Sequence, residues 1–130
     1  MNIFNPADHR ARLLERLQAL QGLVITCFCA DWCNTCKQYA PAFAELARRH
    51  PEHCFVWLDI EDHENLLGDD DIENFPTLQI QNGTQTVFFG PLLPYIEHLE
   101  KLVDRAERGE LPAVTADTPA PLQERLASGA

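Results

Sequence analysis

Hydrophobic residues along this chain follow two patterns, one typical of buried strands and the other of amphipathic helices. Residues 23–29 and 54–60 are almost continuously apolar, as expected for strands that are buried on both faces of a sheet. Apolar residues at helical spacing occupy residues 5–22, 34–50 and 94–109. Because a helix connects the two apolar runs, the pattern predicts a right-handed βαβ unit with parallel strands.

Glycine and proline mark where these helices begin, end or bend. Pro6 opens the first helix and Gly22 ends it. Pro41 lies inside the second helix and is expected to kink it, because proline removes one backbone hydrogen bond. Pro94 opens the last helix, which ends at Gly109.

A β-hairpin is predicted between the second apolar run and the last helix. Asn82 and Gly83 suit the positive φ angles of a tight turn, and residues 77–81 and 84–89 on either side are rich in strand-forming residues. Gly90, which precedes a proline, is expected to end the second strand. Two antiparallel strands therefore complete the sheet.

The length of the chain predicts a single domain followed by a tail. A chain of 130 residues, 45% of them hydrophobic, is long enough for one core and too short for two. We expect the domain at residues 1–109, including an acidic segment at 61–73 with a weak helical signal. Residues 110–130 are rich in Pro, Ala and Thr, which predicts an extended tail with Leu122 and Leu126 as its anchors.

The net negative charge of the chain indicates which kinds of molecule it can bind. The chain carries 10 Lys and Arg against 20 Asp and Glu, a formal net charge of -10. This charge argues against nucleic acid or an anionic membrane surface and favours a neutral or basic protein surface. The first residues lack the basic and apolar regions of an export signal, and no apolar run is long enough to span a bilayer. We therefore expect a cytoplasmic location and no membrane partner, with the oligomeric state left open.

Two closely spaced cysteines are the main candidates for chemistry. Five cysteines, an odd number, in a chain without an export signal favour reduced thiols with redox or metal chemistry. Cys33 and Cys36 lie at a predicted helix start, close enough for a small disulfide ring, and the helix amide groups can stabilise a thiolate on Cys33. Zinc binding by Cys27, Cys29, Cys33 and Cys36 is the alternative, but two of these residues lie in a predicted strand.

The other cysteines and the histidines have simpler interpretations. Cys27, Cys29 and Cys54 are predicted to be small buried core residues, although Cys29 lies near enough to the pair for a second disulfide to form. The histidines are scattered among polar residues and are expected at the surface: His9, His50, His53, His63 and His98.

The order of these elements and motifs resembles the thioredoxin family over about residues 23–102. The resemblance implies a thioredoxin fold, with a central mixed sheet of about four main strands, built as βαβ then ββα and flanked by helices. It also implies that the family's first strand is absent or reduced to residues 2–4, before the N-terminal helix. The residues that carry the resemblance are those at 28–37, Pro41, Asp59, Ile60, Phe75, Pro76, Thr77, Asn82, Gly83 and Gly90.

The resemblance implies a thiol–disulfide oxidoreductase that reduces protein disulfides and transfers electrons in cellular redox balance. Cys33 would be the exposed attacking cysteine, Cys36 the buried resolving cysteine and Pro76 a cis-proline beside them. Substrates would be protein disulfides, preferentially on basic proteins, and electrons would come from a reductase or another thiol donor. No cofactor and no metal are expected. The substrate groove would be lined by Trp32, Phe75, Pro76 and Gly90.

Besides the reduced first strand, the chain departs from the family pattern in the residues around its cysteine pair. Cys27 stands where thioredoxins carry a buried acid, and Trp57 stands where they carry a lysine. The residues between the active-site cysteines are Asn34 and Thr35 rather than Gly and Pro, and a reducing or moderate potential is expected. The acid assists proton transfer in the family, so its loss would slow the resolving step or leave the proton transfer to water. The missing acid, Trp57 and the acidic neighbourhood of Glu73 motivate the alternative, a thioredoxin-like binding or assembly module with weak or no redox turnover.

Overall fold

A computed structural model describes residues 3–4, 15, 22–29, 34–59, 76–83, 85–92, 95–112 and 114. The strands are β1 (Ile3–Phe4), β2 (Leu23–Cys29), β3 (Cys54–Asp59), β4 (Thr77–Asn82) and β5 (Gln85–Pro91), and the helices are α2 (Asn34–Arg49) and α4 (Ile96–Glu107). The predicted N-terminal helix, the acidic segment and most of the tail lie outside the described residues. The tail begins beside β5, because the Val114 N–H donates a 2.8 Å hydrogen bond to the Thr86 carbonyl oxygen.

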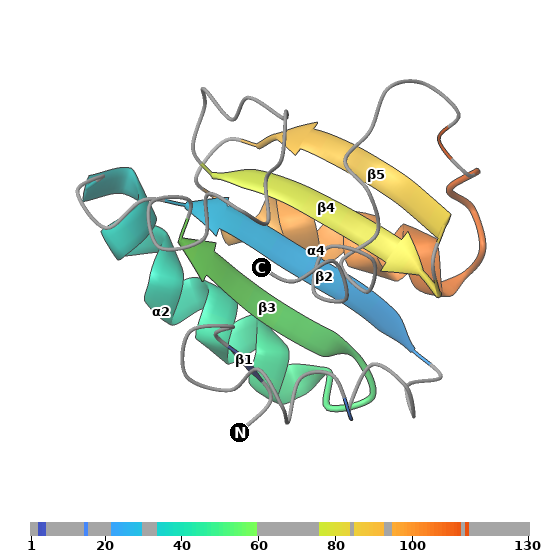
Figure 1. Ribbon diagram of the computed structural model, residues 1–130, viewed down its shortest axis with the longest axis horizontal. Helices are drawn as coiled ribbons and strands as arrows, with labels where there is room; N and C mark the ends of the chain where they lie inside the picture. The colour runs from blue at the N-terminus through green and yellow to red at the C-terminus, as the bar shows by residue number, and fades with distance from the viewer. Residues whose placement is uncertain are drawn as a thin grey trace.

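The strands form one mixed sheet in the order β1-β3-β2-β4-β5 (Figure 1). Strands β1, β3 and β2 run parallel, whereas β4 is antiparallel to both β2 and β5. The predicted fold is therefore confirmed: a βαβ unit and a ββα unit share one sheet. The first strand is reduced to the two residues of β1, as the resemblance implies.

Strand β2 lies at the centre of the sheet, between β3 and β4. All of its residues are buried, as its continuous apolar sequence predicts. Its register places Cys27 opposite Trp57 on one neighbouring strand and opposite Leu78 on the other. The two residues that depart from the family pattern are therefore direct neighbours in the sheet.

Helices α2 and α4 pack on the same face of the sheet and form the main core with it. On the sheet side, alternate residues of β2 face these helices, because successive side chains of a strand point to opposite faces. Phe43 lies in the middle of this core, with ring centroids 5.5 Å from Phe55 and 5.7 Å from Trp57. The helix residues of the core are Cys36, Tyr39, Phe43, Leu46, Ala47, Leu99, Val103 and Ala106.

The hairpin follows its prediction at the turn but not at its end. Gly83 has a φ of 65°, as the turn signal at Asn82 and Gly83 predicts. The expectation that Gly90 ends the strand is wrong, since β5 continues to Pro91. A proline is tolerated there because β5 is an edge strand of the described sheet.

Helix α2 lies at its predicted position, whereas α4 begins at Ile96, later than the predicted start at Pro94, which lies outside the described residues. Helix α2 continues past Pro41, an exposed position inside it, to Arg49. The kink at Pro41 stays a prediction. Neither α2 nor α4 combines the length and the apolar character that a membrane-spanning helix requires.

Replacing Phe43 with Ala should lower the free energy of unfolding by about 3–5 kcal/mol, because a fully buried aromatic ring leaves a cavity that the sheet and helix fill only partly. Urea denaturation followed by circular dichroism measures this loss. The control is Gln38→Ala on the exposed side of α2, which should change stability by less than about 0.5 kcal/mol. Equal stabilities of the two variants would contradict this account of the core.

Candidate active site at the end of strand β2

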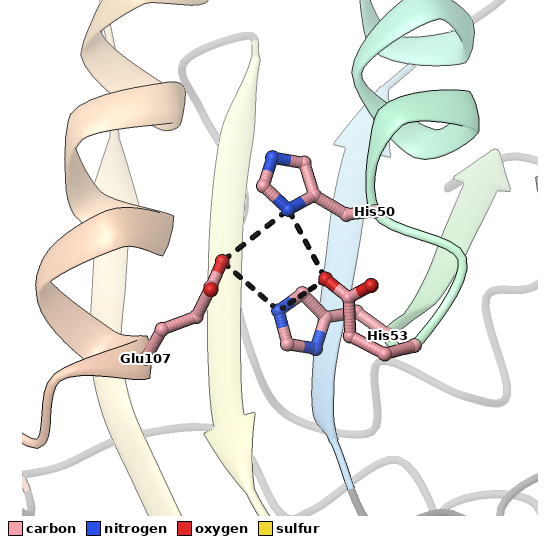
Figure 2. A group of neighbouring side chains, drawn as sticks. His50, His53 and Glu107 are labelled. Carbon is pink, nitrogen blue, oxygen red and sulfur yellow. Dashed lines mark hydrogen bonds and ion pairs between the residues drawn. The ribbon is translucent and has the colours of Figure 1, made fainter.

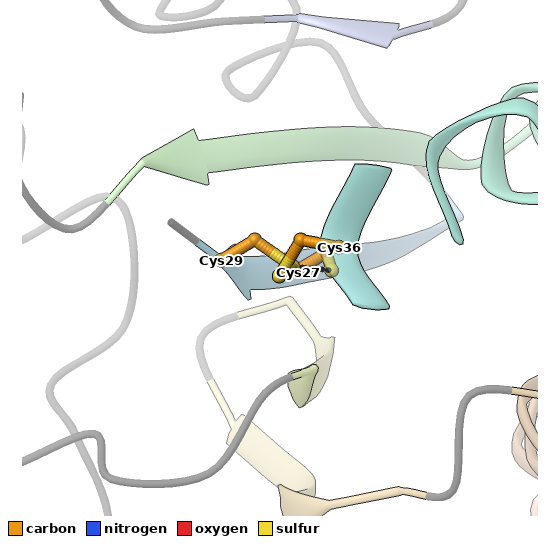
Figure 3. Close-up of a disulfide and its surroundings, with 3 residues drawn as sticks. All are labelled: Cys27, Cys29 and Cys36. Carbon is orange, nitrogen blue, oxygen red and sulfur yellow. Dashed lines mark hydrogen bonds between the residues drawn. A yellow bond between two sulfur atoms is a disulfide. The ribbon is translucent and has the colours of Figure 1, made fainter. Parts of the chain in front are cut away.

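The cysteines gather where β2 ends and α2 begins. Cys29 is the last residue of β2, and Cys36 lies in the first turn of α2. Both side chains point into the space between the sheet and the helix (Figure 3). Trp32 and Cys33 lie outside the described residues, so the predicted role of Cys33 remains a prediction.

Cys29 and Cys36 form a disulfide, with their Cα atoms 5.8 Å apart. This Cα separation lies in the ordinary range for a disulfide. Both residues are buried, at 0% and 1% exposure. The sequence analysis noted that Cys29 lies near enough to Cys33 and Cys36 to form a second disulfide. In the structure Cys29 is bonded to Cys36. In this form Cys36 has no thiol with which to bond Cys33.

Cys27 lies directly beneath the disulfide. Its Sγ atom is 3.7 Å from the Sγ atom of Cys29, and the residue has no exposed surface. Burial raises the pKa of the Cys27 thiol far above its usual range, because the charged thiolate is poorly solvated there. Cys27 therefore stays protonated at neutral pH and is a weak nucleophile. Its burial, and that of Cys54, confirms the prediction for these two residues.

Tyr39 is the second titratable group in this part of the core. Burial raises the pKa of its phenol, and the nearby Cys27 raises it further. The Tyr39 Oη atom has no hydrogen-bond partner among the described residues. Cys27 and Tyr39 are therefore two groups in this part of the core that stay protonated. Cys27 stands at the position where the resemblance implies a buried acid.

Two of the predicted groove residues lie at the same end of the sheet. Pro76 is buried and immediately precedes β4, and the register of β4 on β2 places it beside Cys29. Its carbonyl oxygen accepts a 3.1 Å hydrogen bond from the Leu92 N–H. Gly90 is half-buried in β5 and pairs with β4 one residue pair away from this end. Phe75 lies outside the described residues, so the groove as a whole and the cis bond at Pro76 remain predictions.

A second group of side chains lies at the opposite end of β2. The sequence predicts surface positions for all the histidines, and this is wrong for His53, which is 4% exposed. His50 is half-buried, and both rings lie beside the carboxylates of Glu52 and Glu107 (Figure 2). His98 is exposed as predicted, whereas His9 and His63 lie outside the described residues. The signal that could have found this group is a His-Pro-Glu-His turn placed directly before a buried strand.

Comparison with known proteins identifies the family. The thioredoxin family model matches residues 6–90. Thioredoxin domain-containing protein 2 of Rattus norvegicus is 35% identical over 85 residues, which cover 64% of this chain and 15% of that protein. Thioredoxin of Ophiophagus hannah is 28% identical over 73 residues, 56% of this chain and 70% of that protein. Protein disulfide-isomerase of Aspergillus oryzae is 34% identical over 106 residues, 78% of this chain and 20% of that protein.

The solved structures agree in fold. A poplar thioredoxin h superposes with a TM-score of 0.69 at 23% identity, and the match covers 82% of this chain and 97% of that one. The chain spans only 15% and 20% of the length of two of the relatives above, which are much larger proteins. The family model nevertheless covers more than half of the chain, including both strands of the βαβ unit and the cysteines between them. The chain therefore belongs to the thioredoxin family.

Proposed function

We propose that this chain is a thiol–disulfide oxidoreductase that reduces protein disulfides through Cys33 and Cys36. The observation that supports the proposal is the Cys29–Cys36 disulfide, because it joins the end of β2 to the first turn of α2, where Cys36 lies. The family relationship supports the same chemistry. Pro76 lies beside this junction, where an extended substrate would pair with its backbone.

The reaction consists of two thiol–disulfide exchanges. The Cys33 thiolate attacks one sulfur of a substrate disulfide, forms a mixed disulfide and releases the other substrate sulfur as a thiolate. The Cys36 thiolate then attacks the Cys33 sulfur and releases the second substrate thiolate. Two electrons pass from the dithiol to the substrate, and the released thiolates take up protons. After the second exchange the protein carries a Cys33–Cys36 disulfide. A reductase or another thiol donor then reduces this disulfide.

Cys29 gives Cys36 a second partner. While Cys36 is bonded to Cys29, it has no thiolate to resolve a mixed disulfide on Cys33. Attack by the Cys33 thiolate on the Cys36 sulfur would form the Cys33–Cys36 bond and release Cys29 as a thiolate. The Cys29–Cys36 form is therefore a second oxidised state that exchanges with the first without any external oxidant or reductant.

The substrates are proposed to be disulfides on basic proteins, and the location is proposed to be the cytoplasm. The net charge of -10 supports the first proposal, because opposite charges speed encounter. The proposed substrate groove is lined by Trp32, Phe75 and Gly90. These residues would surround the peptide bond that precedes Pro76. A binding or assembly module without turnover is the second candidate, and the buried, protonated Cys27 beside Trp57 favours it, since it offers no base for the resolving step.

Replacing Cys33 with Ser should reduce the rate of insulin-disulfide reduction in the presence of dithiothreitol to the uncatalysed level. The reason is that the first exchange step loses its nucleophile. The matched control is Cys54→Ala, which removes a buried cysteine at the far end of β3 and should retain the wild-type rate. Equal rates for wild type and Cys33→Ser would favour the binding module instead.

Replacing Cys36 with Ser should trap mixed disulfides between Cys33 and substrate proteins, because nothing then resolves them. Adducts recovered from a cell extract on a non-reducing gel and identified by mass spectrometry should be enriched in basic proteins. The Cys33→Ser, Cys36→Ser double variant controls for adducts at other cysteines. Recovery of the same adducts from the double variant would contradict a substrate groove at Cys33.

Oxidised wild-type protein should contain a chymotryptic peptide pair in which Cys29 is bonded to Cys36. Cleavage after Trp32 separates Cys29 from the later cysteines, and tandem mass spectrometry assigns the bonded sulfur. In Cys29→Ser the pair should be absent, and Cys36 should be found bonded to Cys33. Finding Cys36 bonded only to Cys33 in oxidised wild-type protein would contradict the second oxidised state.

A further inference from the structure

Four side chains with metal-binding atoms meet at the end of the sheet away from the cysteines. His50 follows the last residue of α2, Glu52 and His53 belong to the turn before β3, and Glu107 is the last residue of α4. One donor atom from each residue lies within 4.8 Å of the other three. His50 Nδ1 and His53 Nε2 each lie beside both the Glu52 and the Glu107 carboxylate, as the dashed lines in Figure 2 mark.

The separations between these atoms match those of ligands around one metal ion. His50 Nδ1 lies 3.2 Å from Glu52 Oε1 and 3.3 Å from Glu107 Oε1. His53 Nε2 lies 3.2 Å from Glu107 Oε1 and 3.5 Å from Glu52 Oε1. Ligands that bind zinc at about 2.0 Å in a tetrahedron are about 3.3 Å apart. The separation of His50 Nδ1 from each carboxylate is therefore that of two ligands on one ion.

A tight turn holds the two histidines in this arrangement. The His53 N–H donates a 3.1 Å hydrogen bond to the His50 carbonyl oxygen, and Pro51 occupies the second position of this turn, which it favours. The two imidazole rings stack with centroids 5.7 Å apart and 12° between their planes. The turn therefore fixes both rings before any ligand binds.

The Nε2 atom of His53 faces the other three side chains, and this nitrogen carries the proton of the ring. Its Nδ1 atom accepts a 2.9 Å hydrogen bond from the Leu23 N–H, so the proton of the neutral ring is on Nε2. Gly22 makes this approach possible, because a Cβ atom there would lie 2.6 Å from Nδ1. The Nε2 atom is buried and has no hydrogen bond among the described residues, although the Glu52 and Glu107 carboxylates lie beside it.

The group has an excess of negative charge. Two carboxylates, those of Glu52 and Glu107, lie within 3.5 Å of the same two imidazole nitrogens. Glu107 ends α4, where the partial negative charge of the helix disfavours a second carboxylate. The nearby arginines pair with other acids, Arg49 with Glu100 and Arg108 with Glu110. A bound cation would offset this charge.

We propose that His50 Nδ1 and one carboxylate oxygen each from Glu52 and Glu107 bind a divalent transition-metal ion of the zinc class. An imidazole ligand favours zinc, copper or nickel over magnesium or calcium. His53 is a positioning residue, since its Nε2–H lies 3.2 Å from Glu107 Oε1 and 3.5 Å from Glu52 Oε1 and attracts both ligating carboxylates. A surface pocket of about 380 Å³, lined in part by Glu52, His53 and Glu107, gives the ion a route and leaves room for water as a fourth ligand.

The metal site is independent of the thiol chemistry. Leu23 and Cys29 stand at opposite ends of β2, about 20 Å apart at 3.3 Å per residue. The two proposals can therefore fail separately. Zinc also binds thiolates, so the test uses full-length, oxidised protein whose remaining reactive thiols have been alkylated.

Isothermal titration calorimetry with zinc chloride should detect one zinc ion per wild-type chain. Glu107→Gln and His50→Ala should each weaken zinc binding at least tenfold, because each removes a ligand. The matched controls on α4 are Glu97→Gln and His98→Ala, which are exposed, lie outside the group and should bind zinc like wild type. A hundredfold excess of magnesium should not displace zinc. Equal zinc affinities of wild type and Glu107→Gln would overturn the proposal.

Spectroscopy tests which atoms bind. Cobalt in place of zinc should give visible absorption without a thiolate charge-transfer band, whereas such a band would assign the ion to the cysteines and overturn the site. Long-range ¹H–¹⁵N spectra should show a large shift of His50 Nδ1 on zinc binding, while His53 keeps its proton on Nε2. Loss of that proton would contradict the positioning role of His53.

Discussion

The burial of β2 on both faces, between two neighbouring strands, is the constraint on which both sites depend. Each of its residues is buried, and it pairs with β3 along one edge and β4 along the other. Its two ends are therefore held in fixed positions. At one end Cys29 meets Cys36, and at the other the Leu23 N–H meets His53. Each site combines one end of β2 with an end of α2, and α4 contributes Glu107 to the second.

The protonated core beneath the disulfide distinguishes this chain from the family pattern that its sequence resembles. Cys27 pairs with Trp57 in the sheet and keeps its proton, because burial disfavours the thiolate. Tyr39 keeps its proton for the same reason. A group that stays protonated accepts no proton from Cys36, so we expect the resolving step to depend on proton transfer to water or to the substrate.

The sequence predicted those features that arise from local patterns. Continuous apolar runs gave the positions of β2 and β3, and the turn chemistry of Gly83 located the hairpin, because strand burial and positive φ leave clear signals. It did not predict the continuation of β5 through Gly90, because a glycine and a proline are tolerated on an edge strand. It also missed the burial of His53, since the Leu23 N–H that binds its ring lies thirty positions earlier in the chain.

The choice between the two partners of Cys36 could not be made from spacing. Cys33 is nearer to Cys36 in sequence. Cys29 nevertheless contacts Cys36, because β2 ends beside the first turn of α2. The most direct test is a redox titration of the full chain in dithiothreitol buffers, in which differential alkylation and mass spectrometry measure the oxidised fraction of each cysteine. At every potential, the oxidised fraction of Cys36 should equal the sum of those of Cys29 and Cys33. Oxidation of Cys33 in chains whose Cys36 is still a thiol would contradict a centre built around Cys36.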